Sequence, residues 1–182
     1  MNVYEGQNEY EGHWITAYPS GTKFHYLNPS EEEINIHDIA HALSLTCRFG
    51  GHCREFYSVA EHSVRVAEEV DRDHKLAALL HDAHEAYLHD VPRPIKLDII
   101  GYKHIADGVQ AAINTKFRLP LSYGFSIRQA DDCLLATEAR DLGIDTTDWL
   151  ELPEPLEDTI YPWTAQDAEA SFLTYFEVWR GR

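Results

Sequence analysis

An apolar, helix-like run becomes strongly polar in the stretch LAALLHDAHEAYLHD, residues 76–90. The stretch holds three histidines and three carboxylates, where an ordinary packed helix would carry leucine or alanine. Burying an unpaired charge costs several kcal/mol, so these groups need a compensating partner. Imidazole nitrogens and carboxylate oxygens are common ligands of divalent metal ions. The stretch therefore predicts a buried polar site that binds a cation.

Two successive predicted helices carry the first candidate ligands. His62 shares a helical stripe with Val59 and Val66, so its side chain is expected to point inward. The next predicted helix carries the adjacent pair His81 and Asp82. Because consecutive helices joined by a short turn pack antiparallel, this pair is expected to come close to His62.

A third helix supplies an inward-facing acid. Asp131 shares its stripe with Ile127 and Leu134, and the neighbouring Asp132 fits that stripe only slightly less well. Taken singly, an inward histidine is most often a satisfied core residue, and a lone aspartate is most often a cap or solvated. Two imidazoles and two carboxylates from three helices instead favour a divalent cation, with Mn, Co, Fe, Zn or Mg as candidates.

The elements expected to position these residues are mostly helices. Residues 1–34 contain a candidate β-hairpin, HWITAY and TKFHYL around a Pro-Ser-Gly turn. Asn35 is a candidate N-cap for a helix that ends before Gly50. Ser58 followed by Glu61 is a capping-box pattern that opens the helix of His62.

The second half of the chain continues the helical pattern. Caps and apolar stripes predict further helices from Asp73 to near Asp90, over residues 98–117, from Ser126 with Gln129 to Gly143, and from Thr164 onward. The acidic, proline-rich residues 145–163 are expected to form a long ordered loop. The whole pattern predicts an all-α fold of about six helices with a small N-terminal β-hairpin.

Composition narrows the class of protein. A chain of 182 residues with 44% hydrophobic residues is expected to form one domain with a substantial core. The formal net charge of −16 argues against nucleic-acid polymers as partners, although a local arginine cluster and a cation allow a small phosphorylated ligand. No apolar run predicts a membrane span, and three cysteines without a C-x-x-C pair indicate a reducing, cytoplasmic setting.

At these residues the sequence resembles the HD-domain metal-dependent phosphohydrolases, whose pattern is H…HD…D on an all-α core. The similarity covers roughly residues 35–142, in the segments INIHDIAHALSLTCRFGGH, FYSVAEHS, LLHDAHEAYLHDVPRPIK and QADDCLLATEARDL. It is close to the branch of bacterial 5'-deoxynucleotidases and their small prophage and phage relatives. The resemblance implies a single HD domain over residues 1–182, with the hairpin region at 1–34, the HD core at 35–142, and the acidic loop and C-terminal helix at 143–182.

The resemblance also implies roles for individual residues. It makes His62, His81, Asp82 and Asp131 the metal ligands, because QAD aligns with the last acid of the family pattern. It assigns catalytic roles to Glu85, Asp90 and Arg48, and phosphate binding to Arg48 with Phe49. Family members often carry Trp where this chain has Phe49.

Residue types favour side chains as the phosphate ligands. The segment CRFGGHC lacks the G-x-x-x-x-G-K pattern of a phosphate-binding loop. Arg48 is the best clamp because its planar fork matches two phosphate oxygens. The secondary candidates for substrate contact are Arg54, Arg93 and Lys96 for the phosphates, and Phe49, Tyr57 and Tyr87 for the sugar and base.

The expected activity is hydrolysis of a 5'-phosphate from a small deoxynucleotide. The most specific expectation is a phage-type dATP or dNTP triphosphohydrolase, in host cytoplasm if phage-encoded, and a homo-oligomer is an open alternative to a monomer. A 5'-deoxynucleotidase restricted to monophosphates is the first alternative, and a non-catalytic module that binds metal or nucleotide is the second. A di-iron oxygenase would need extra ligands from His84, His89 or His104, of which His84 is expected on the helix surface.

Overall fold

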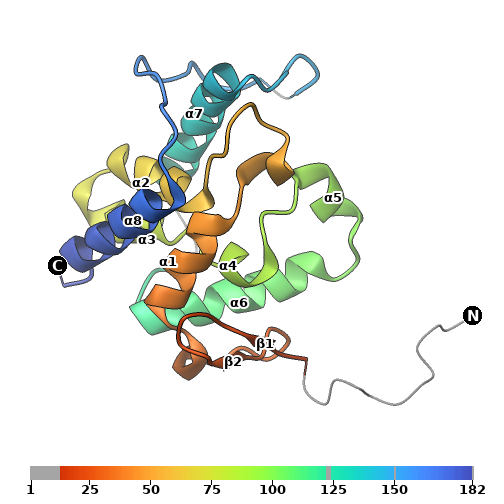
Figure 1. Ribbon diagram of the computed structural model, residues 1–182, viewed down its shortest axis with the longest axis vertical. Coiled ribbons are helices and arrows are strands. Elements are labelled where there is room, and N and C mark those ends of the chain that lie inside the picture. The colour runs from red at the N-terminus through yellow and green to blue at the C-terminus, as the bar shows by residue number, and fades with distance from the viewer. Residues whose placement is uncertain (1–12, 122–123, 150, 182) are drawn as a thin grey trace, which may run out of the picture.

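The computed structural model describes residues 13–121, 124–149 and 151–181 (Figure 1). Within these residues the chain forms eight α-helices, three short 3-10 helices and one two-stranded hairpin. The predicted all-α class with a small β appendage is therefore confirmed. The expected number of about six helices was too low. One predicted helix breaks near Leu80, and an additional helix begins at Arg93.

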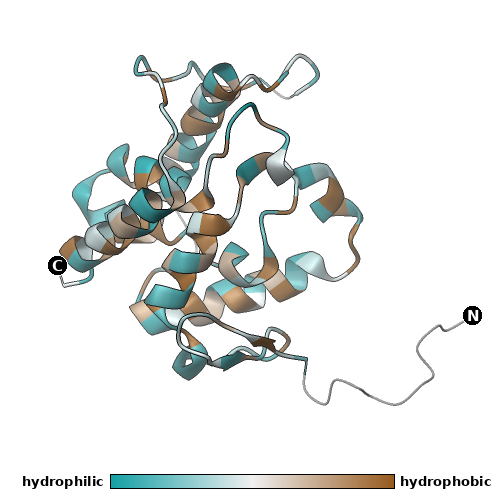
Figure 2. Ribbon diagram, in the orientation of Figure 1, coloured by the Kyte–Doolittle hydropathy of each residue, from teal (hydrophilic) through white to brown (hydrophobic). Residues whose placement is uncertain are grey.

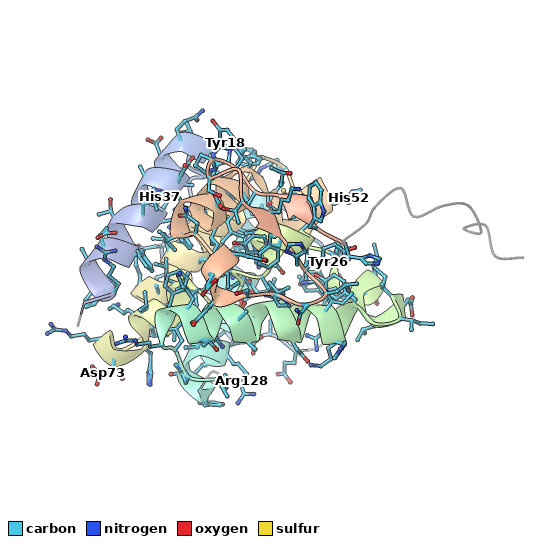
Figure 3. The ribbon with its side chains drawn as sticks, turned by 90° about the horizontal axis from the view of Figure 1, so that it is seen from below. Tyr18, Tyr26, His37, His52, Asp73 and Arg128 are labelled. Atoms are coloured by element: carbon cyan, nitrogen blue, oxygen red, sulfur yellow. The ribbon has the colours of Figure 1, made fainter. Side chains whose placement is uncertain are left out.

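The N-terminal hairpin is present and short. β1 (Ile15–Thr16) pairs with the antiparallel β2 (Lys23–Phe24), with Ile15 opposite Phe24. Phe24 is fully buried, and its ring stacks on Tyr87 with ring centroids 3.7 Å apart. Tyr26, labelled in Figure 3, is partly buried against the core. These aromatic contacts, together with hydrogen bonds from Ser20 to the Asp38 carboxylate, attach the hairpin to the helical body.

Two predicted N-caps are confirmed at the helices that begin the core. α1 (Ile36–Leu45) starts after Asn35, whose side-chain oxygen accepts a hydrogen bond of 2.9 Å from the backbone N–H of His37. α2 (Val59–Glu68) starts after Ser58, whose hydroxyl accepts from the backbone N–H of Glu61 at 3.1 Å. The Glu61 carboxylate pairs elsewhere, with Arg65 and with a backbone N–H of the C-terminal loop.

The predicted single helix from Asp73 to Asp90 is wrong. Asp73 lies inside the 3-10 helix η3 (Arg72–His74), and the chain then forms α3 (Lys75–Leu79), a turn over residues 80–84, and α4 (Glu85–Leu88). The Nδ1–H of His81 donates to the carbonyl oxygen of Ala78 at 2.7 Å. The turn continues through i→i+3 backbone bonds, such as that from Glu85 to Asp82. The helix is therefore interrupted at the polar pair His81 and Asp82.

The second half contains one helix that was not predicted and two with corrected starts. α5 (Arg93–Asp98) begins at the proline-rich segment, and α6 (Tyr102–Phe117) starts after Gly101 instead of at residue 98. α7 (Phe125–Leu142) starts after Gly124. Ser126 is not its cap, because that residue lies in the first turn and its hydroxyl contacts His74 Nδ1 at 3.1 Å. The predicted end at Gly143, with a φ of 74°, is confirmed.

The C-terminal helix closes the core. α8 (Ala165–Trp179) is capped as predicted by Thr164 and packs on α1, α2 and α3, where Phe172 and Phe176 are buried. Figure 2 shows apolar and polar residues alternating along the long helices, as expected of helices with one buried face. The described residues of the loop over 145–163 contact this core through Ile160 and the partly buried Trp163. Such contacts are expected of an ordered loop. Among the described helices, none has the length and apolar character needed to cross a membrane.

Candidate metal centre

Three of the predicted ligands meet at one point between α2, the turn after α3, and α7. His62, His81 and Asp131 each present a ligand atom, and these atoms lie within 4.8 Å of one another. The Nε2 of His62 is 3.2 Å from Asp131 Oδ1, and the Nε2 of His81 is 3.9 Å from the same oxygen. This group can hold a metal ion, as the sequence predicted.

Asp82 borders the same point. Its Oδ2 lies 3.1 Å from His81 Nε2 and 3.7 Å from His62 Nε2. The exposed Asp132, the alternative to Asp131, is not part of this group among the described residues. The third helix therefore contributes Asp131, in agreement with its place on the apolar stripe.

The histidine rings are oriented so that both Nε2 atoms face the centre. His62 Nδ1 lies 2.6 Å from Glu138 Oε1, and His81 Nδ1 donates to the Ala78 carbonyl. Both Nε2 atoms are buried, and neither has a hydrogen-bond partner of suitable geometry within the described residues. Buried polar atoms are normally paired, so two orphaned imidazole nitrogens beside two carboxylates fit a cation.

The ionisable side chains at the centre shift one another's pKa values in the metal-free chain. Burial and Arg48 act to lower the pKa of His62, but Glu138 and Asp131 outweigh them and raise it to about 9. The pKa of His81 is also raised, because Asp82 outweighs the effect of burial. Burial acts to raise the pKa of Asp82, yet His81 and His62 lower it well below its usual value. Without a cation, protons on the imidazoles therefore balance the carboxylates.

Glu138 is a site residue that the sequence analysis missed. It lies on α7, its side chain is fully buried, and it contacts both His62 and Arg48. Burial acts to raise the pKa of Glu138, but Arg48 and His62 lower it below its usual range. The sequence held one indication of this role. Glu138 shares a helical stripe with Asp131 and Leu134, where an acid without a partner is not expected.

Arg48 lies beside the centre and is mostly buried. Its Nε and Nη2 pair with Glu138 Oε2 at 3.1 and 3.0 Å, and its Nη1 is 3.8 Å from Asp82 Oδ2. Burial acts to lower the pKa of Arg48, but Glu138 and Asp90 outweigh it, so the guanidinium stays charged. The adjacent Phe49 is partly buried, with its ring centroid 5.4 Å from the guanidinium carbon.

The loop that carries Arg48 has a constrained backbone. Phe49 has a φ of 58°, in the left-handed region that non-glycine residues rarely adopt, and Gly50 has a φ of 60°. A Cβ at Gly50 would lie 3.3 Å from Pro92 Cγ, so the loop is in close contact with the segment that follows Asp90. Such strain often accompanies a functional side chain whose position is fixed by its surroundings.

Glu85 and Lys96 form an ion pair near Asp90. Lys96 Nζ lies 2.7 Å from Glu85 Oε1 and 3.8 Å from Asp90 Oδ1. Glu85 Oε2 is buried without a hydrogen-bond partner among the described residues. Burial, Asp82 and Asp90 raise the pKa of Glu85 to about 8, although Lys96 opposes them. Glu85 is thus a buried acid whose proton is exchangeable near neutral pH.

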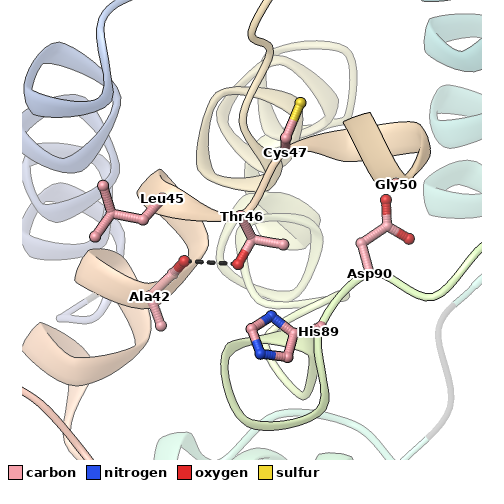
Figure 4. A pocket seen from close by; sticks show the side chains of 7 residues that line it. All are labelled: Ala42, Leu45, Thr46, Cys47, Gly50, His89 and Asp90. Carbon is pink, nitrogen blue, oxygen red and sulfur yellow. Dashed lines mark hydrogen bonds between the residues drawn. The ribbon is translucent and has the colours of Figure 1, made fainter. Parts of the chain in front are cut away.

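A cavity of about 380 Å³ adjoins this pair (Figure 4). Asp90 and His89 line it, and Thr46, at its opposite wall, donates its hydroxyl to the Ala42 carbonyl at 2.8 Å. The remaining lining residues are Leu45, Cys47 and Gly50. Asp90 is the one candidate site residue that lines the described cavity, and it lies 3.8 Å from Lys96 Nζ.

Several secondary candidates lie away from the centre. Arg93 is exposed at the start of α5, and Arg54 is exposed and donates to the carbonyl of Asp141. Tyr87 is a buried core residue. Tyr57 is also buried but lies near Glu138, because burial and that carboxylate raise the pKa of its hydroxyl. His84 is not on the surface as expected, because it is partly buried and bonds Gln110.

No protein-family model matches the chain. The chain is 43% identical over 126 residues to the uncharacterized protein YfdR of Escherichia coli K12, an alignment that covers 69% of this chain and 71% of YfdR. The chain belongs to the YfdR family. It is also 39% identical over 121 residues to an uncharacterized protein of Rhodobacter capsulatus, covering 61% of this chain and 62% of that relative. The names of these YfdR-type proteins state no activity.

Proposed function

We propose that the chain is a divalent-metal-dependent phosphohydrolase that removes the 5'-phosphate group of deoxynucleotides. One observation carries the proposal: the donor atoms of His62, His81 and Asp131 lie within 4.8 Å of one another, with Arg48 3.8 Å from the adjoining Asp82 carboxylate and Glu85 close enough for Asp82 to raise its pKa. A cation site with a fixed guanidinium and an exchangeable acid is suited to phosphoester hydrolysis.

Asp82 is the proposed fourth ligand. Its Oδ2 is close to both Nε2 atoms, and its pKa is lowered by His81 and His62 despite burial, so it is ionised at neutral pH. A dication held by these four residues would neutralise charge on the phosphate and make a water molecule more acidic. The mixed set of imidazoles and carboxylates suits Mn, Co, Fe, Zn or Mg.

Arg48 and Glu85 have separate tasks in the proposed reaction. Arg48 binds phosphate oxygens through Nη1, the guanidinium nitrogen that Glu138 does not engage. Water attacks the phosphorus, the bond from phosphorus to the 5' oxygen breaks, and Glu85 donates its proton to that leaving oxygen. The proton lost by the water restores the acid. Lys96 positions Glu85 through Oε1 and leaves Oε2 available.

The substrate proposal is a deoxynucleoside triphosphate, with dATP as the most specific candidate. It rests on the resemblance to compact phage enzymes of the HD-domain superfamily. The cavity beside Asp90 and His89 has room for part of a nucleoside, and Lys96 adds positive charge beside Asp90. A 5'-deoxynucleotidase would break the same type of bond in a monophosphate, so the two alternatives differ in the number of phosphates bound.

The competing interpretations have less support among the described residues. A purely metal-binding module does not need a buried acid with an unpartnered oxygen beside the metal, as Glu85 has. A second iron would need further histidine ligands, yet His84 bonds Gln110, and His89 and His104 are exposed. The oxygenase interpretation therefore lacks a second set of ligands.

The test is product analysis with a full panel of deoxynucleoside mono- and triphosphates and their ribose counterparts. We expect chromatography to show a deoxynucleoside and inorganic triphosphate formed from dNTPs in the presence of Mn²⁺, and neither product with a chelator. An Asp82→Asn variant, purified in parallel, controls for contaminating phosphatases. Absence of any nucleoside product with all five candidate metals overturns the proposal, and products from monophosphates alone select the nucleotidase.

A further inference from the structure

Glu138 connects the metal centre to the arginine beside it. Its Oε1 lies 2.6 Å from His62 Nδ1, and its Oε2 accepts from Arg48 Nε at 3.1 Å with Nη2 at 3.0 Å. The Glu138 side chain is fully buried, and its two partners come from different parts of the chain. We propose that Glu138 is a positioning residue that couples cation binding to phosphate binding, by fixing His62 with one oxygen and Arg48 with the other.

The two histidines of the centre are fixed in different ways. His81 donates its Nδ1–H to the backbone carbonyl of Ala78, so its ring orientation does not depend on another side chain. Within the part of the chain that the structure describes, the Nδ1 of His62 contacts only the Glu138 carboxylate. A carboxylate accepts hydrogen bonds and cannot donate them when ionised, so it keeps the proton on Nδ1 and leaves the Nε2 lone pair for a cation. The geometry of His62 as a ligand therefore depends on Glu138.

The orientation of Arg48 depends on the same carboxylate. Glu138 engages Nε and Nη2, which form one edge of the guanidinium, and leaves Nη1 facing Asp82 Oδ2 at 3.8 Å. A guanidinium is planar, so fixing one edge fixes the direction of the remaining donors. The free edge thereby points to the space beside the metal centre, where an anion bound to the cation would lie.

Glu61 offers a matched control. It is also a fully buried glutamate that pairs with one arginine, because its Oε1 lies 3.0 and 2.8 Å from the Nε and Nη2 of Arg65, and its Oε2 accepts from the backbone of Trp163. Glu61 precedes His62 in the chain, but within the described residues no hydrogen bond or ion pair joins the Glu61 side chain to a proposed ligand. Glu61→Gln removes the same buried charge as Glu138→Gln, so it reports the purely structural cost of such a change.

The experiment measures two affinities without any turnover. The Mn²⁺ affinity of the metal-free chain is measured by calorimetric titration, and the inorganic phosphate affinity is then measured at saturating Mn²⁺. We expect Glu138→Gln to lower the Mn²⁺ affinity by about 10- to 100-fold, as is typical for a residue that orients a ligand, and to lower the phosphate affinity as well. We expect Glu61→Gln to stay within about twofold of the unmodified chain in both affinities.

Two results overturn the inference. The first is a Glu138→Gln variant whose two affinities match those of Glu61→Gln. The second comes from the unmodified chain loaded with Zn²⁺: NMR must show the Nδ1–H of His62 protected from solvent exchange by its hydrogen bond to the Glu138 carboxylate, and an Nδ1–H that exchanges freely with water contradicts the inference. The NMR result decides the question even if Glu138→Gln does not fold.

This inference rests on the proposed function, but the two fail separately. A chain that binds Mn²⁺ and phosphate as expected and releases no phosphate from any nucleotide overturns the phosphohydrolase alone. A chain that hydrolyses deoxynucleotides while Glu138→Gln and Glu61→Gln bind Mn²⁺ equally well overturns the role of Glu138 alone.

Discussion

Asp131 Oδ1 lies 3.2 Å from His62 Nε2, across the space between α7 and α2. The next residue, Asp132, is exposed on the other side of the same helix turn. The two aspartates have the same chemistry and adjacent positions, so the helix orientation alone separates them. This pair gives a sharp test of the metal centre.

Removal of a residue that only supports a ligand weakens metal binding by about 10- to 100-fold. We expect Asp131→Asn to weaken Mn²⁺ binding by more than this. Asp132→Asn should bind Mn²⁺ like the unmodified chain, because its side chain is exposed. Calorimetric titration of both variants measures the difference. Equal affinities in the two variants would remove Asp131 from the ligand set.

Glu85→Gln should retain the metal and lose turnover. The substitution keeps the shape of the side chain and removes the exchangeable proton, so we expect kcat to fall by about 100- to 10,000-fold. Mn²⁺ affinity should stay close to that of the unmodified chain, because His62, His81 and Asp131 are unchanged. A variant with normal kcat would show that Glu85 transfers no proton.

The pH dependence of kcat should report the proton on Glu85. An acid that donates to the leaving oxygen must be protonated, so kcat should fall as pH rises through the pKa of Glu85. That pKa is raised to about 8 by burial, Asp82 and Asp90 in the metal-free chain, and a bound dication would lower it. We therefore expect the decline at or below about pH 8 in a pH profile. A rise in kcat over the same range would make Glu85 a base instead.

Metal binding should release protons. The pKa of His62 is raised to about 9 in the metal-free chain, so the ring is protonated at neutral pH, and a cation must displace that proton from Nε2. Mn²⁺ affinity should consequently increase as pH rises toward about 9. Calorimetry in buffers of different ionisation enthalpy measures the number of protons released. Binding that is independent of pH would contradict His62 as a ligand.

The cap of α1 gives a prediction about stability that does not involve the site. Asn35→Ala removes the hydrogen bond to the His37 N–H and should lower the free energy of unfolding by about 1 kcal/mol. Asn28→Ala is the control, because Asn28 is exposed and its side chain makes no hydrogen bond with the other described residues. Urea unfolding measures both changes. An equal effect in the two variants would show that the cap contributes little.

Local features of the fold were predictable because their causes lie within a few residues. Asn35, Ser58 and Thr164 cap helices as predicted, since a cap needs only a side-chain oxygen and an N–H two or three residues later. Helical periodicity likewise placed His62 and Asp131 on inward faces. Ser126 fits the same local pattern but does not cap the helix. α7 already begins at Phe125, and the Ser126 hydroxyl contacts His74 instead.

The amino-acid sequence alone determined the helical class, the small hairpin and the residue types that gather at the centre, because periodicity and capping act along one helix. Only the tertiary structure decided that the helix breaks at Leu80 and that Glu138 joins His62, 76 residues away along the chain, to Arg48. The reason is physical: burying several charged groups together is favourable only when each finds a partner, and those partners come from distant segments.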